Sequence, residues 1–177
     1  MSTCAAKPGA PLLLIARALP KPYSLPMRQP IQVAIYCFAH VADGWRVLML
    51  HRIPENFPIW QGVTGGVEDD ESPMTAARRE FGEETGFTPR FFEQIDHTYT
   101  FPLDDRWRSR YDWTVDEMTE HVFVALMDHT DAPTLSPHEH DEFRWCTMDE
   151  ALELMYWESN KESLLHCLRH LETRRAD

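Results

Sequence analysis

Three glutamates lie within five residues of one another and directly follow a pair of arginines. Glu80, Glu83 and Glu84 come after Arg78 and Arg79 in the stretch RREFGEE. A helix turns by about 100° per residue, so Glu80 and Glu84 fall on nearly the same side and Glu83 lies about 60° from Glu80. Like charges at these spacings destabilise a helix by about a few tenths of a kcal/mol per pair. The three carboxylates converge on one patch and need a cation that neutralises them.

Two kinds of cation can neutralise this patch. One is a divalent ion, because a dense set of oxygen ligands suits Mg²⁺ or Mn²⁺, which keep several waters and bind substrate phosphates. The other is an arginine, with Arg79 paired to Glu83 at i,i+4 on a solvent-exposed helix face. The spacing of the glutamates alone does not separate these two interpretations.

A longer pattern of fixed residues surrounds the cluster. It runs Gly65, five residues, Glu71, seven residues, Arg79-Glu80, an apolar residue, any residue, Glu83-Glu84, any residue, Gly86 and an apolar residue. Residue types used at about 7% each would match seven fixed identities by chance on the order of 10⁻⁸ per starting position. The pattern resembles the Nudix box at every fixed position, and the chain is identified as a member of the Nudix hydrolase family.

The resemblance implies an α/β protein with the Nudix fold, in which a mixed β-sheet is sandwiched between helices. It also implies Mg²⁺-dependent cleavage of a phosphoanhydride bond, with Mn²⁺ as a substitute ion. In the family, the counterparts of Glu80, Glu83 and Glu84 bind the metal, and a carbonyl at the position of Gly65 helps. A metal would also let an acidic protein handle an anionic substrate.

The other fixed residues of the box have physical roles that can be stated. We expect Glu71 and Arg79 to form an ion pair that holds the loop against the helix. Gly65 and Gly66 let the backbone approach an ion or phosphate closely and turn into the helix.

The reaction also needs a general base, which Nudix enzymes often take from a loop beyond the box. The stretch SPHEHDEFRW offers Glu139, and Asp141 and Glu142 follow it. We expect Glu139 to be the base and a metal-site residue, with Glu120 as the second candidate. The flanking histidines, His138 and His140, are expected to be solvated, because Mg²⁺ prefers oxygen ligands.

Within the family, the chain most resembles the dihydroneopterin triphosphate pyrophosphohydrolases of folate biosynthesis, from Arg28 to the C-terminal helix. The supporting stretches are RVLMLHR, WQGVTGGVE, RSRYDWTVDEMTEHVF and EHDEFRW. The resemblance places substrate contacts at Arg28, Arg52 and Thr64, and Glu120 is a further substrate-binding candidate. One or two aromatic residues are expected to stack on the substrate ring, from the set Trp60, Trp107, Tyr111 and Trp113.

Other substrates and functions stay open at this point. Gly66 replaces an expected serine, and Pro102 lies fifteen residues beyond Phe87, a spacing found in ADP-ribose hydrolases. Nucleoside triphosphates, dinucleoside polyphosphates and ADP-ribose are therefore alternative substrates. A non-catalytic nucleotide sensor and an isopentenyl diphosphate isomerase are alternative functions; the second is disfavoured because Cys37 and Cys146 lie in apolar stretches typical of a core.

The composition of the chain limits the kinds of ligand and partner that it can bind. Its 177 residues carry a net charge of −12 with no basic stripe, so we expect a small-molecule phosphate substrate and no nucleic acid. The four cysteines are far apart and are expected to be reduced thiols of a cytoplasmic protein. No stretch reads as a signal peptide or membrane span. Nothing in the sequence predicts the oligomeric state.

The elements that must position these residues are predicted as follows. Residues 1–29, rich in proline, form an irregular arm, and residues 30–177 form the Nudix domain. A hairpin turning at Asp43-Gly44 comes first, then a short extended piece ending at Gly66. Ser72, Pro73 and Gly86 mark a helix over about 73–85. Three strands follow, and the tail forms two helices broken near Glu158-Ser159-Asn160.

Overall fold

The computed structural model describes residues 28–176, so most of the predicted arm lies outside the described residues. Arg28 and Gln29, the last two arm residues, are bound to the domain. The Arg28 N–H donates to the Arg110 carbonyl at 3.2 Å, and the Gln29 N–H donates to the Val67 carbonyl at 3.1 Å. Arg28 is thereby fixed beside the first strand.

A mixed sheet of seven strands forms the middle of the molecule. Its path is β3-β2-β1-β6-β5, with β4 paired to β1 and β7 paired to β2. Only β1 and β6 run parallel among these pairs. The strands are β1 (Ile31–Val41), β2 (Gly44–Arg52), β3 (Trp60–Gln61), β4 (Val63–Gly66), β5 (Phe91–Pro102), β6 (Glu117–Met127) and β7 (His140–Cys146).

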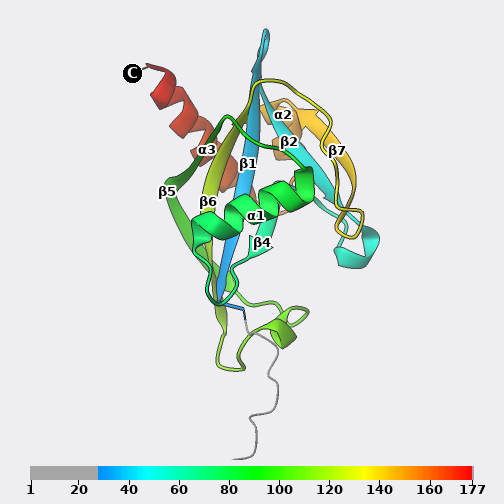
Figure 1. Ribbon diagram of the computed structural model, residues 1–177, viewed down its shortest axis with the longest axis vertical. Helices are drawn as coiled ribbons and strands as arrows, with labels where there is room; N and C mark the ends of the chain where they lie inside the picture. Colours follow the sequence, from blue (N-terminus) through cyan, green and yellow to red (C-terminus); the bar gives the residue numbers. More distant parts are fainter. Residues whose placement is uncertain (1–27, 177) are drawn as a thin grey trace, which may run out of the picture.

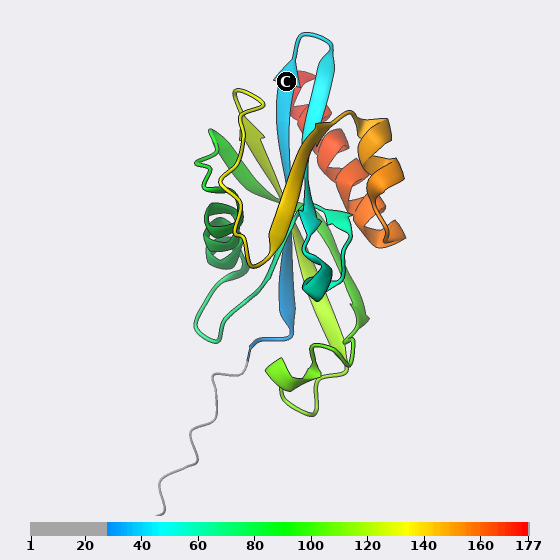
Figure 2. The same ribbon diagram turned by 90° about the vertical axis from the view of Figure 1, so that its right-hand side faces the viewer.

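Helices cover both faces of this sheet. Helix α1 (Pro73–Thr85) crosses one face, and α2 (Met148–Leu154) and α3 (Glu158–Ala176) cover the other, as Figures 1 and 2 show from two directions. Two short 3-10 turns, η1 (Pro54–Asn56) and η2 (Arg108–Arg110), lie in the connections. The predicted α/β sandwich is confirmed.

The central strand β1 changes partner along one of its edges. Its other edge pairs with β6 from Ile31 to Ala39. On the edge that changes partner, residues 32–35 pair with β4 and residues 38–41 pair with β2. Strand β2 therefore separates from β1 beyond Val47, and β4 takes its place beside β1, which opens the sheet between β4 and β2.

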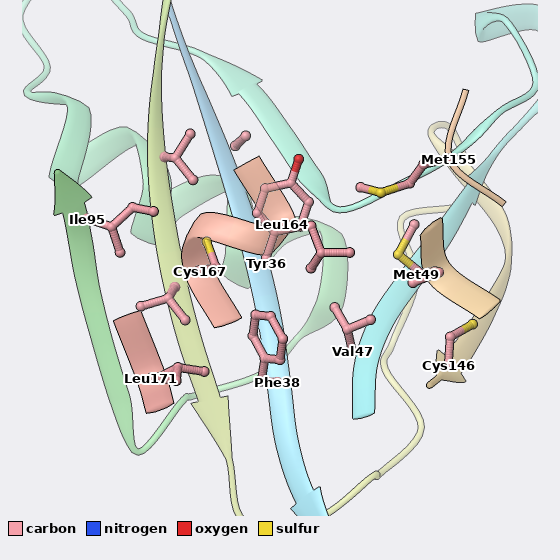
Figure 3. Packing of buried hydrophobic residues seen from close by; sticks show 14 residues of the cluster. Tyr36, Phe38, Val47, Met49, Ile95, Cys146, Met155, Leu164, Cys167 and Leu171 are labelled. Carbon is pink, nitrogen blue, oxygen red and sulfur yellow. The ribbon is translucent and has the colours of Figure 1, made fainter. Parts of the chain in front are cut away.

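The core follows the alternation of side chains along the strands. Alternate β1 residues such as Tyr36 and Phe38 pack under α2 and α3 together with Leu164, Cys167 and Leu171 (Figure 3). The intervening residues, such as Ile35 and Cys37, pack under α1 against Phe81. Cys37 and Cys146 are buried, as their apolar contexts predict.

Helix α1 begins and ends at the predicted residues. The Ser72 hydroxyl accepts the Thr75 N–H, Pro73 is the first helical residue, and Gly86 caps the end with φ of 69° in the left-handed region that favours glycine. The helix thus holds Glu80 and Glu84 in fixed orientation toward the sheet.

The two predicted helices of the C-terminal tail are confirmed, but the break between them lies about three residues before the predicted position. Helix α2 ends at Leu154, and Met155, Tyr156 and Trp157 form the link. Met155 is 3% exposed and forms an isolated bridge with Trp60, so packing ends the helix before Glu158. Ser159 and Asn160 therefore lie in the first turn of α3. Among residues 28–176, no helix has the length and apolar composition that crossing a membrane requires.

Candidate active site

A cavity of about 420 Å³ opens where β4 and β2 diverge. Its walls come from both faces of the sheet, because α1 contributes Glu80 and Glu84 while β6 and α3 contribute Glu120 and Asn160. The loop between β5 and β6 closes one end with Trp107. A cavity of this size suits a small-molecule ligand.

The box glutamates separate into a buried pair and an exposed third. Glu80 is 7% exposed and Glu84 is 2% exposed, and both line the cavity. Burial raises the pKa of Glu80, although hydrogen bonding to Arg79 opposes the shift. Burial, with repulsion from Glu139 and Glu80, raises the pKa of Glu84 well above its usual value. The Glu83 side chain is 62% exposed and lies 3.4 Å from Arg79.

Arg79 joins the box loop to the helix, as predicted. Its guanidinium donates to Glu71 at 2.9 and 2.8 Å and to the Gly66 carbonyl at 3.2 Å. It also donates to Glu80 at 2.8 Å. The Arg79–Glu83 pair of the alternative interpretation is present as well, but it is the longest of these contacts.

The paired glycines of β4 serve close packing. A side chain at Gly65 would overlap the side chain of Glu80, and one at Gly66 would approach the Arg28 guanidinium within 2.8 Å. Neither glycine has a positive φ. The glycines therefore let Glu80 and Arg28 approach the backbone closely, and their approach to an ion or phosphate stays a prediction. The expectation that they turn the chain into the helix is wrong, because both lie within β4.

The start of β7 brings two more residues to the cavity. Glu139 lines it, and His140 is 3% exposed. The expectation that His140 is solvated is wrong, because pairing of β7 with β2 opposite Arg52 carries it inside. Burial, with a contribution from the Arg52 charge, lowers the pKa of His140 to about 4. The imidazole is therefore neutral at neutral pH.

Glu84, Glu139 and His140 form a group of potential metal ligands. One atom from each lies within 4.8 Å of the others, and His140 Nδ1 is 3.6 Å from Glu84 Oε2. Within the described chain, Glu84 Oε2 and both ring nitrogens of His140 are buried without a hydrogen-bond partner. Buried polar atoms normally have partners, so these atoms fit a bound divalent cation with its waters. Glu80 lines the same cavity and extends the oxygen donor set.

A cationic wall lies in the same cavity. Arg28, Arg52 and Arg110 line it, and no carboxylate oxygen between residues 28 and 176 comes within 4.0 Å of their guanidinium nitrogens. The Arg52 and Arg110 guanidiniums stack on the Trp107 ring at 5.6 and 4.8 Å. Burial lowers the pKa of Arg52, while Glu84 and Glu139 oppose the shift. Arginines that have no carboxylate partner among residues 28–176 suit an anionic ligand in this acidic protein.

The opposite wall carries a buried acid. Glu120 is 2% exposed and lines the cavity from β6. Its carboxylate accepts from the Tyr99 hydroxyl and from Gln32 Nε2, both at 2.6 Å. Burial raises its pKa to about 7, although both hydrogen bonds oppose the shift.

The remaining predicted residues fall in two groups. Thr64, Trp107 and Tyr111 line the cavity, whereas Trp60 does not and Trp113 is 84% exposed. Three further residues line the cavity but are not among the predicted site residues: Tyr99, Arg110 and Asn160. Arg110 had a signal, since it stands in the basic and aromatic stretch RWRSRY before β6.

Comparison with known proteins gives two kinds of match. The family profile described as "NUDIX domain" matches residues 30–167. The dihydroneopterin triphosphate diphosphatase of Haemophilus influenzae is 30% identical over 148 residues, which cover 81% of this chain and 89% of that protein. An RNA pyrophosphohydrolase of Dinoroseobacter shibae is 30% identical over 131 residues, covering 69% and 78%.

A solved structure gives a similar result. The E. coli dihydroneopterin triphosphate pyrophosphohydrolase superposes with a TM-score of 0.65 at 28% identity. The match covers 77% of this chain and 93% of that one. The similarity thus extends over nearly the whole of the solved protein.

Proposed function

The chain belongs to the Nudix hydrolase family, and we propose that it is a Mg²⁺-dependent pyrophosphohydrolase of dihydroneopterin triphosphate. Water adds to the α-phosphorus, the α–β phosphoanhydride bond breaks, and pyrophosphate leaves with its electron pair. The products are dihydroneopterin monophosphate and pyrophosphate. This reaction would place the enzyme in folate biosynthesis, and a cytoplasmic location stays a prediction.

The observation that carries the proposal is the set of buried polar atoms on Glu84 and His140, beside Glu139, that have no hydrogen-bond partner in the described part of the chain. The two carboxylates supply the oxygen ligands that Mg²⁺ prefers, and the neutral imidazole of His140 adds no positive charge that would repel the ion. When bound, Mg²⁺ polarises the phosphoryl oxygens and lowers the pKa of a coordinated water. Glu80 and Glu84 would hold the ion on the α1 side of the cavity, and Glu83 stays a predicted ligand.

Glu139 is the proposed general base. It lines the cavity beside Glu84, at the end of the loop before β7. From there its carboxylate would take the proton of the attacking water. Arg52 and Arg110 would hold the phosphates that leave as pyrophosphate, because their guanidiniums have no carboxylate partner among the described residues.

Glu71 and Arg79 would support the reaction indirectly, by holding the acidic residues of α1 in place. The Arg79 guanidinium binds Glu71, the Gly66 carbonyl and Glu80 at once. It therefore fixes the helix that carries the acidic ligands relative to the strand that carries Gly65 and Thr64. We assign both residues a positioning role.

A substrate panel tests the proposal. Purified protein with Mg²⁺ is assayed on dihydroneopterin triphosphate, nucleoside triphosphates, diadenosine polyphosphates and ADP-ribose, and the products are identified. We expect pyrophosphate release with the highest kcat/KM for dihydroneopterin triphosphate. If the highest kcat/KM is instead found for ADP-ribose, with AMP and ribose 5-phosphate as products, then ADP-ribose is the substrate and dihydroneopterin triphosphate is not. No turnover of any compound would support the non-catalytic sensor.

An RNA substrate is the second candidate, because one relative at 30% identity is named an RNA pyrophosphohydrolase. The net charge of −12 disfavours a long polyanion. An RNA oligonucleotide with a 5′-triphosphate therefore belongs in the same panel, and we expect it to be hydrolysed more slowly than the free triphosphates.

A further inference from the structure

The buried carboxylate of Glu120 has no cationic partner in the described chain. It is 2% exposed, and no arginine or lysine nitrogen between residues 28 and 176 lies within 4.0 Å of it. Burying an acid without a cation is costly, and such groups concentrate at functional sites. The cavity is the side from which a partner can reach Glu120, since the residue lines it.

The neighbours of Glu120 fix the plane of its carboxylate. The Tyr99 hydroxyl donates to Oε1 and Gln32 Nε2 donates to Oε2, so each oxygen holds one hydrogen bond. Asn160 Oδ1 lies 3.1 Å from the Tyr99 hydroxyl, and the Asn160 carbonyl accepts from Tyr36. An ionised carboxylate offers about four acceptor positions, so one position on each oxygen is still available.

A carboxylate with one acceptor position available on each oxygen can accept two parallel N–H donors. We propose that Glu120 binds the edge of a heterocycle that carries an adjacent ring N–H and exocyclic amino group, as in the 2-amino-4-oxo-pyrimidine ring shared by pterins and guanine. Adenine, cytosine and hypoxanthine lack this pair of adjacent donors. Glu120 is thus a specificity-determining residue for the ring of the substrate, a role that rests on the proposed function.

The position of Glu120 in the cavity agrees with this role. It projects from the α3 face of the sheet, like Val122 and Val124 on the same strand, whereas Glu80 and Glu84 approach from the α1 face. The phosphates and the ring of one substrate can therefore occupy opposite sides of the sheet opening. Phe101, Tyr111 and Met118 line the cavity and offer apolar surface to a flat ring.

The test compares GTP with ITP, which differ only by the 2-amino group. Assays run above about pH 8, where a carboxyl with a pKa of about 7 is ionised. We expect the wild-type protein to favour GTP in kcat/KM by about 10-fold or more, the effect of one hydrogen bond to a charged group. Glu120→Gln should bring the ratio close to 1, because an amide presents one donor and one acceptor.

Glu117→Gln is the matched control, since Glu117 is an exposed residue of the same strand. It should keep the wild-type ratio. Hydrolysis of dihydroneopterin triphosphate is measured in parallel. If Glu120→Gln lowers kcat/KM for this compound and for GTP alike, Glu120 binds the ring edge that the two share. If it lowers kcat/KM for only one of them, Glu120 binds the ring of that compound.

The outcomes separate this inference from the proposed function. Equal hydrolysis of GTP and ITP by the wild-type protein would overturn the role of Glu120 while leaving the hydrolase activity in place. Absence of hydrolysis of every triphosphate would refute the proposed function itself. The ratio of kcat/KM for GTP to that for ITP in the wild-type protein decides whether the role of Glu120 stands, so this test does not depend on whether Glu120→Gln folds.

Discussion

The guanidinium of Arg79 binds the carboxylate of Glu71 through two hydrogen bonds, at 2.9 and 2.8 Å, across the turn from β4 to α1. The same guanidinium contacts Glu80, which is 7% exposed in the cavity. Loop, strand and helix are therefore joined at one cation, and the orientation of the acidic residues depends on it.

Replacement of Arg79 by lysine should weaken both stability and turnover. Lysine cannot form the two parallel hydrogen bonds to Glu71. With the Arg79 side chain 26% exposed, solvent screening limits the expected loss to about 1–2 kcal/mol in the free energy of urea unfolding. Arg78→Lys, which alters an arginine stacked on Phe92 beside the pair, should change stability by less than about 0.5 kcal/mol. Equal effects of the two variants would contradict the positioning role.

Gly65→Ala should reduce activity sharply, because its methyl group would overlap the Glu80 side chain. We expect kcat to fall by about 10²-fold or more as Glu80 is displaced. Gly82→Ala is the control in the adjoining helix, where a methyl group meets nothing within 4 Å. That variant should gain about 0.5–1 kcal/mol of stability from better helix propensity. Wild-type kcat in Gly65→Ala would refute the contact.

Glu84→Gln should separate turnover from folding. The variant loses a metal-binding charge, and we expect kcat to fall by about 10²–10³-fold. Burial raises the pKa of Glu84 in the folded state. As pH rises above the pKa of this carboxyl in the unfolded chain, the wild-type protein therefore loses folding stability. Metal-free Glu84→Gln should therefore melt at a higher temperature than metal-free wild type near about pH 8. A lower melting temperature would mean that Glu84 has a stabilising partner.

Glu139→Gln tests the general base. We expect kcat to fall by about 10²–10⁴-fold while the binding of a non-hydrolysable substrate analogue changes little. The pH–rate profile should also change. An unchanged profile would transfer the role to another residue that lines the cavity.

The stability of the protein should depend on pH through Glu120. Burial raises its pKa to about 7 in the folded state, so this carboxyl holds its proton after an unfolded chain has lost it. Between about pH 4.5 and 7 the folded state binds more protons, and stability falls as pH rises. We compare the free energy of unfolding of Glu120→Gln with that of wild type, in urea at constant ionic strength. The difference in favour of the variant should be larger above pH 7 than below pH 4.5 by about 1–3 kcal/mol. A pH-independent difference would contradict the shift.

The helix that carries the box could be predicted from sequence because its signals are local. Ser72, Pro73 and Gly86 each fix a backbone or capping interaction within the helix itself. The continuous apolar run of β1, VAIYCFA, likewise predicts a strand with both faces buried. Such features need no knowledge of distant parts of the chain.

The burial of His140 and the pairing around Glu120 could not be predicted in this way. His140 enters the cavity because β7 pairs with β2, about ninety residues earlier in the chain. Glu120 meets Tyr99 and Gln32 through two different strand pairs. The break before α3 also depends on packing, since Met155 contacts Trp60. Long-range register decides each of these positions.

Titration with Mn²⁺, followed by the electron paramagnetic resonance signal of the free ion, tests the central claim most directly. The claim predicts that wild-type protein with a non-hydrolysable triphosphate analogue takes up Mn²⁺, that Mg²⁺ competes for the site, and that Glu84→Gln weakens the uptake by about 10-fold or more. Free Mn²⁺ that stays undiminished by wild-type protein, with and without the analogue, would contradict it.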